Sequence, residues 1–245
     1  MTTTEVVIVV LVGCCAGIIK SITGMGYPLV LLPILALFID VADAVVIVAP
    51  SNLVLNLRLV GGARHEWSSS TTLPRFLAGA VVGAIAGSLL LTSLPNTLLL
   101  VALVVVIVMF LLSQVRSDTV TVSESQGRRL APLVGAIAGV FQGAAGISGP
   151  VVTPWFLSVG LSRDAYLLSI GAVFALTGIA QLVVVGLQGV FTVELFSLGM
   201  ALIPLTLLSF PAGVVIRERV STDTFHRIIL VLLATSAVSL VVRIV

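Results

Sequence analysis

Residues 13–28 read GCCAGIIKSITGMGYP and residues 135–150 read GAIAGVFQGAAGISGP, so one pattern occurs twice at a constant offset of 122. Lys20 is the one charged residue of the first copy, and it aligns with Gln142 in the second. A duplicated apolar segment that is broken by glycine and carries a cation is typical of a binding site at the membrane midplane. Five positions are identical in this register, namely Gly13 and Gly135, Ala16 and Ala138, Gly17 and Gly139, Gly24 and Gly146, and Pro28 and Pro150.

The composition is that of an integral membrane protein. Hydrophobic residues make up 59% of the 245 residues and charged residues 9%, with a mean hydropathy of +1.28, whereas a soluble domain has about 25% charged residues. The apolar runs are continuous rather than alternating, which favours transmembrane helices over a barrel. MTTTE lacks a basic leader, so we expect the first apolar segment to be retained.

No enzyme motif or cofactor motif is present. The sequence contains no Walker A loop, GxSxG or HExxH motif, and its two histidines are not clustered with acidic residues. We therefore expect no enzyme activity, no cofactor, no metal site and no nucleic-acid partner.

Ten apolar segments divide equally between two halves. We predict an N-terminal repeat (1–116), a cytoplasmic linker (117–129) and a C-terminal repeat (130–245). Because five is an odd number, the second half enters the membrane from the side opposite to the first, which predicts inverted repeats. The segments are 5–22, 26–39, 42–60, 74–93 and 96–115, followed by 130–146, 149–160, 164–187, 194–216 and 221–243.

The basic residues support this topology. If both termini lie outside, ten of the twelve lie on the other side of the membrane, and the positive-inside rule places that side in the cytoplasm. Arg243 stays outside and Lys20 lies within a segment. The ten residues are Arg58, Arg64, Arg75, Arg116, Arg128, Arg129, Arg163, Arg217, Arg219 and Arg227.

Two segments are too short to cross the membrane alone. Residues 26–39 and 149–160 would form about 21 and 18 Å of helix, against a hydrocarbon core of roughly 30 Å. We predict that each folds back on the preceding segment as a re-entrant or bent hairpin, with tips at 24–26 and 146–149 that meet near the midplane. About eight conventional spans remain. The alternative is that these glycines only permit close helix packing.

Lys20 is the sharpest candidate for binding a substrate. A buried amine attracts anions, while snorkelling to the interface is the alternative. The side chain of Gln142 would offer the anion a neutral hydrogen-bond donor. The helices that begin after Gly26 and Gly149 would offer backbone N–H groups and the positive ends of their dipoles.

Asn52 and Asn56 lie four residues apart and share one helix face, where they serve either the site or interhelical packing. Ser148 adds a hydroxyl, and Gln181 belongs to a sparser polar stretch. The predicted substrate-binding set is Lys20, Gly24, Gly26, Asn52, Asn56, Gln142, Gly146, Ser148 and Gly149.

The duplicated G-x3-G-x6-G hairpin, the following proline, the Asn-bearing span ending at a basic loop with Trp67, and the two-half layout resemble the TauE/SafE family of sulfite exporters. The resemblance implies secondary transport of a small sulfur-containing anion, such as sulfite or an organosulfonate, across the cytoplasmic membrane. It also implies a coupling ion, proton or sodium. The first hairpin reads Gly24-Met25-Gly26-Tyr27, without the run of consecutive glycines usual in the family, which leaves the exact substrate open.

We therefore expect an all-α polytopic membrane protein of two inverted repeats, each a glycine-broken hairpin followed by three transmembrane helices. The function expected is transport of a sulfur anion by alternating access. The alternatives are a permease or channel for a different small anion, and a non-transporting membrane scaffold. Oligomeric state and transport direction are left open.

Overall fold

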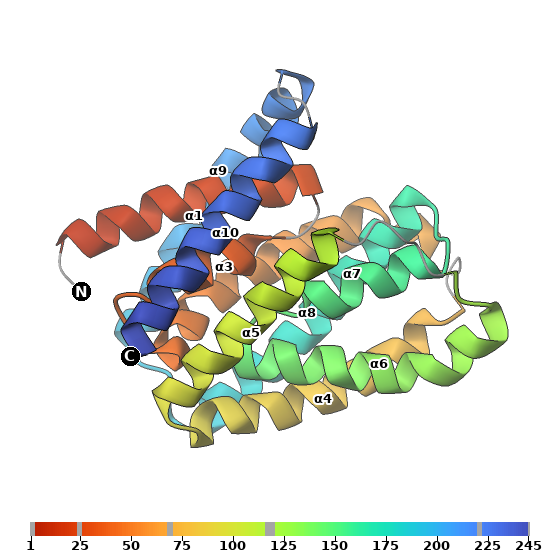
Figure 1. Ribbon diagram of the computed structural model, residues 1–245, viewed down its shortest axis with the longest axis horizontal. Coiled ribbons are helices and arrows are strands. Elements are labelled where there is room, and N and C mark those ends of the chain that lie inside the picture. Colours follow the sequence, from red (N-terminus) through yellow and green to blue (C-terminus); the bar gives the residue numbers. More distant parts are fainter. Residues whose placement is uncertain (1–2, 24–25, 68–70, 116–120, 220–221, 245) are drawn as a thin grey trace.

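The computed structural model of the 245-residue chain describes residues 3–23, 26–67, 71–115, 121–219 and 222–244, and every element in these ranges is helical (Figure 1). The elements are α1 (Thr3–Thr23), α2 (Tyr27–Leu35), α3 (Val41–Gly62), the 3-10 helix η1 (Arg64–Glu66), α4 (Leu73–Ser93), α5 (Asn96–Val115), α6 (Glu124–Ala145), α7 (Gly149–Ser158), α8 (Arg163–Leu187), α9 (Val193–Arg219) and α10 (Thr222–Ile244).

The α-helices follow the ten predicted segments, and the largest difference is at the start of α6. This helix begins at Glu124 rather than near residue 130, inside the stretch predicted as a linker. The side chain of Ser123 accepts a hydrogen bond from the Gln126 N–H, and the Gln126 side chain accepts one from the Ser123 N–H. This capping box stabilises a polar first turn that hydropathy alone does not detect.

The two short helices return along the helices that precede them. The N–H of Val122, just before α6, donates to the carbonyl of Ser158 at the end of α7 (3.0 Å), so α7 ends beside the start of α6. Likewise, α2 packs against α1. With nine and ten residues, α2 and α7 are only about 14 and 15 Å long, well short of a bilayer core.

The most extensive helix contacts occur in equivalent pairs, so that each contact from the first half to the second has a counterpart from the second half to the first. The first helix of each half packs on the fourth helix of the other half, which gives the pairs α1–α9 and α6–α4. The third helices, α3 and α8, pack on each other, and each also contacts the fourth helix of the opposite half. This arrangement is expected of a duplicated unit related by a pseudo-two-fold axis.

α4 and α6 form the closest of these seams and lie side by side in Figure 1. A Cβ on any of six glycines would overlap main-chain atoms of the facing helix, so the two backbones are in direct contact. This is the packing expected of small residues repeated every four positions. The six are Gly79, Gly83 and Gly87 on α4, and Gly135, Gly139 and Gly143 on α6.

The α1–α9 seam repeats one of these contacts. A Cβ on Gly17 would lie 3.2 Å from the carbonyl oxygen of Thr206, and one on Gly139 would overlap the carbonyl oxygen of Ala80. Gly17 aligns with Gly139 in the repeated sequence, and Thr206 and Ala80 occupy matching positions in the fourth helices.

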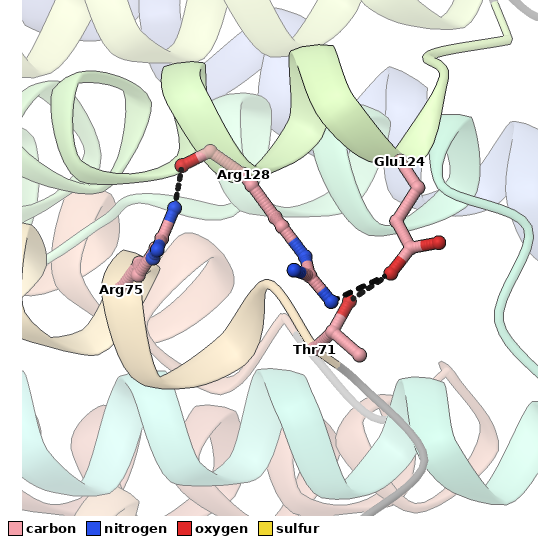
Figure 2. Close-up of polar contacts among 4 residues, drawn as sticks. All are labelled: Thr71, Arg75, Glu124 and Arg128. Atoms are coloured by element: carbon pink, nitrogen blue, oxygen red, sulfur yellow. Dashed lines mark hydrogen bonds and ion pairs between the residues drawn. The ribbon is translucent and has the colours of Figure 1, made fainter.

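Polar contacts join the N-terminal ends of α4 and α6 at one end of the bundle (Figure 2). Glu124 accepts hydrogen bonds from Thr71 (3.2 Å) and from the guanidinium of Arg128 (2.9 Å). Arg75 donates to the carbonyl of Arg128 (3.1 Å). These residues belong to segments that the predicted topology places in the cytoplasm.

The other end of the bundle gathers a separate set of chain segments. The N–H of Val41 donates to the side-chain oxygen of Asn96 (3.0 Å), and Arg243 donates to the carbonyls of Ala36 and Ile39. These residues belong to segments that the predicted topology places outside.

Three helices are long and apolar enough over their described residues to cross a membrane: α3, α4 and α8. Shorter apolar stretches occur in α1, α5, α9 and α10. Large apolar side chains such as Val82, Leu98 and Leu112 are exposed on the outer helices, as expected for contact with lipid. These findings are consistent with a membrane protein, and the count of eight spans stays a prediction.

Candidate functional site

Lys20 lies on the last turn of α1 and is completely buried. Its ammonium nitrogen donates to Oδ1 of Asn52 (3.1 Å) and to Oδ1 of Asn56 (2.7 Å). It also lies 5.6 Å from the ring centroid of Phe174, within the range of a cation–π interaction. The side chain therefore points into the protein and does not snorkel to the interface.

The amine has no fixed counter-charge in the described part of the chain. No carboxylate there lies within ion-pair distance of its Nζ atom. Amide oxygens occupy two of the three donor positions, and the third position has no partner among the described residues. Such a site can accept a negatively charged ligand.

Asn52 and Asn56 share one face of α3, as their spacing predicts, and both are buried. Their shared partner is Lys20, so they hold the amine in place across the α1–α3 contact. Two pockets at the hairpin tips are described below. Asn52 lines one of them, and Asn56 lines neither.

Gln142 holds the second hairpin tip together. Its Nε2 donates to the carbonyl of Gly146 (3.2 Å), and its Oε1 accepts from the hydroxyl of Ser148 (3.0 Å). Gly146 has a φ of 68°, a left-handed conformation that glycine adopts without strain, and its N–H donates to the carbonyl of Gln142. The tip is thus a closed turn that ends α6 and allows α7 to begin.

Gln181 on α8 fixes this tip from outside the hairpin. Its Nε2 donates to the carbonyls of Gln142 (2.8 Å) and Gly143 (3.0 Å), which lie in the last turn of α6. Helix-terminal carbonyls need such external partners when they are buried.

The first tip is described from Gly26 onward, and Gly24 lies outside the described residues. Gly26 has a φ of 100° and precedes α2, which has Pro28 in its first turn. Gly149 and Pro150 open α7 in the same way. Proline is favoured there because the first helical N–H groups have no intrahelical acceptor.

One pocket brings the two tips together. It holds about 320 Å³ of empty space, including the part open at its mouth. The first tip, the end of α1, the second tip and α8 all contribute to its wall. The lining residues are Lys20, Gly26, Pro28, Leu29, Gln142, Gly146, Ile147, Ser148, Gly149 and Phe174.

A second pocket adjoins the first and shares Pro28, Gln142 and Gly146 with it. Its wall adds the amides of Asn52 and Gln181 from α3 and α8. The N-terminal ends of α2 and α7, the Lys20 amine and three buried amides thus surround one region between the two halves.

Of the predicted set, the structure brings Lys20, Gly26, Gln142, Gly146, Ser148 and Gly149 to the first pocket and Asn52 to the second. The sequence prediction missed Phe174 and did not include Gln181. One signal was available for Phe174, because it is the position that corresponds to Asn52 at the offset of 122. No group of three or more His, Cys, Asp or Glu among the described residues could hold a metal ion.

Comparison with models of known protein families places this chain in a family. The sequence model of the family described as sulfite exporter TauE/SafE matches residues 9–240, which is nearly the whole chain. This protein therefore belongs to the TauE/SafE family, a family of membrane transporters, as its repeated hairpin indicated. No curated protein and no solved structure matches the chain.

Proposed function

We propose that this member of the TauE/SafE family is a secondary transporter that carries a small sulfur-containing anion, such as sulfite or an organosulfonate, by alternating access. The observation that carries the proposal is the meeting of the Lys20 amine with the N-terminal ends of α2 and α7 at one pocket. Lys20 is fully buried and lines that pocket, and the third donor of its amine has no partner among the described residues, so the helix ends are not the only feature that points to a ligand.

The electrostatics of this region favour an anion. Each helix N-terminus carries about half a positive charge and offers N–H groups that lack intrahelical acceptors. The ammonium adds one full charge, with no described carboxylate to neutralise it. Sulfur oxyanions present several acceptor oxygens in a compact group, which suits donors that converge from two tips.

The equivalent helix contacts between the two halves support alternating access. The pocket lies between the first half (1–116) and the second half (130–245), and both halves contribute a hairpin to it. Rocking one half against the other would open the pocket toward one side at a time. In this proposal the repeats are inverted in the membrane, both termini lie outside, and the basic loops face the cytoplasm.

Anion binding to the purified protein tests the proposal. Sulfite, thiosulfate, sulfate and methanesulfonate are added separately, and the melting temperature of wild type is compared with that of Lys20→Met. A ligand that binds only the native state raises the melting temperature. Loss of a hydrogen bond to a charged group costs about 1.5–3 kcal/mol, so Lys20→Met should weaken binding about tenfold or more.

Arg75→Met is the matched control, because it removes one positive charge from an exposed guanidinium at the end of the bundle. It should leave anion binding close to wild type. Proteoliposomes loaded with the stabilising anion then test transport directly. Phosphate and acetate are added as sulfur-free anions, and a response confined to them would favour a permease or channel for another substrate. No response to any anion in folded protein would favour the scaffold alternative.

A further inference from the structure

We propose that Lys20 carries the coupling proton of transport, with its amine taking up one proton as the anion binds and releasing it as the anion leaves. This inference rests on the proposed function and identifies the coupling ion, which family membership leaves open. It assigns the Lys20 amine a second role beyond contacting the anion.

The geometry around Nζ suits both protonation states. A neutral amine has two N–H groups and one lone pair, whereas the ammonium has three N–H groups. The oxygens of Asn52 and Asn56 can accept the same two hydrogen bonds in either state, at 3.1 and 2.7 Å. Only the third position changes, from a lone pair to a donor, and Lys20 lines the tip pocket where a ligand would meet it.

The surroundings provide no competing charge among the described residues. The titratable groups on the helices around Lys20 lie outside ion-pair distance of Nζ, and most of them sit near helix ends. They are Cys14 and Cys15 on α1, Tyr27 on α2, Asp43 and Arg58 on α3, Glu124, Arg128 and Arg129 on α6, Arg163, Asp164 and Tyr166 on α8, and Glu194 on α9. The anion would therefore be the counter-charge of the ammonium.

This arrangement couples the two binding events. An ammonium in the protein interior is costly without a partner, and an anion there is costly for the same reason. When both are present, each offsets the desolvation of the other. Thermodynamic linkage then requires that the anion strengthens proton binding by the same factor by which the proton strengthens anion binding.

Proton uptake on anion binding tests the inference. Thiosulfate and methanesulfonate serve as probes because both remain ionised between about pH 6 and pH 9, so neither takes up a proton itself. Each is titrated into wild-type protein in weak buffer with a pH indicator. We expect up to one proton taken up per anion bound, and an affinity that falls by up to tenfold per pH unit as the empty-site amine loses its proton.

Two variants separate proton coupling from simple charge attraction. The guanidinium of Lys20→Arg stays protonated, so this variant should bind the anion without proton uptake and with a flat pH profile. Asn56→Asp would place a carboxylate in the position that now accepts a 2.7 Å hydrogen bond from the amine. It should hold the ammonium permanently, abolish proton uptake and weaken anion binding.

The outcomes distinguish this inference from the proposed function. If wild type binds the probes without proton uptake at any pH, or needs sodium instead, the inference is overturned while the proposed function stands. Proton uptake that persists in Asn56→Asp or in Lys20→Arg would also overturn it. If neither probe nor any other sulfur anion binds the folded wild type, the proposed function fails and the inference fails with it.

Discussion

Lys20 and its two asparagines form a buried unit whose members depend on one another. Asn56→Leu keeps a similar volume but removes one acceptor from the amine, which should lower the free energy of unfolding by about 1–3 kcal/mol. Adding Lys20→Met should recover part of that loss, because it removes the amine that had lost an acceptor. The recovery is not complete, because the Oδ1 atom of Asn52 then loses its donor.

Thermal unfolding in detergent of wild type, Asn56→Leu, Lys20→Met and the double variant measures the coupling as a double-mutant cycle. Additive effects of the two substitutions would contradict the direct contact between Lys20 and Asn56.

The sequence predicted the residues at the two hairpin tips better than the residues of α8 that contact them. Lys20, Gly26 and Gly146 were predictable because an isolated cation and positive-φ glycines leave local signals. Phe174 and Gln181 were not selected, because an aromatic residue and a single amide on a long apolar helix are ordinary locally. Their roles depend on how α8 is rotated against α6 and α1, which the sequence pattern of α8 does not specify.

At the scale of helices, the glycine seam between α4 and α6 anchors the second hairpin. Gly139→Ala would place a Cβ onto the carbonyl of Ala80, so the helices would have to separate. We expect a loss of about 1–3 kcal/mol or more, as in overpacked interiors.

Gly61→Ala on α3 is the matched control, since nothing lies within 4 Å of its added Cβ. It should be neutral or stabilising by up to about 1 kcal/mol, because alanine favours the helix. Melting temperatures of both variants check the difference, and an equally stable Gly139→Ala would argue against direct backbone contact in this seam.

Element boundaries were predictable where hydropathy changes sharply and not where the helix is polar. The sequence placed α8 and α5 almost to the residue, since apolar runs end there at charged or turn residues. It missed the first turns of α6, which are polar and depend on the Ser123 and Gln126 cap. It also extended α2 beyond Leu35, because apolar residues continue into the following turn.

In the whole molecule, the helix ends lie in two groups, as expected for an inverted duplication. One group gathers the N-terminal ends of α4 and α6 with the C-terminal end of α7, and the other gathers the ends of α2 and α10 with the starts of α3 and α5. Each group matches one side of the topology derived from the arginines. This agreement supports the inverted repeat.

Cysteine labelling in intact cells tests the orientation of the protein in the membrane. Cys14 and Cys15 are the only natural cysteines of the chain and would be replaced by alanine. Single cysteines are then introduced as His65→Cys, near the start of α4, and as Gln188→Cys, at the C-terminal end of α8. A membrane-impermeant maleimide should label only the Gln188→Cys protein in intact cells, because positive-inside topology puts the arginine-rich end in the cytoplasm. Both should react after permeabilisation. Labelling of the His65→Cys protein in intact cells would reverse the orientation, and equal labelling of both positions would contradict their placement on opposite sides of the membrane.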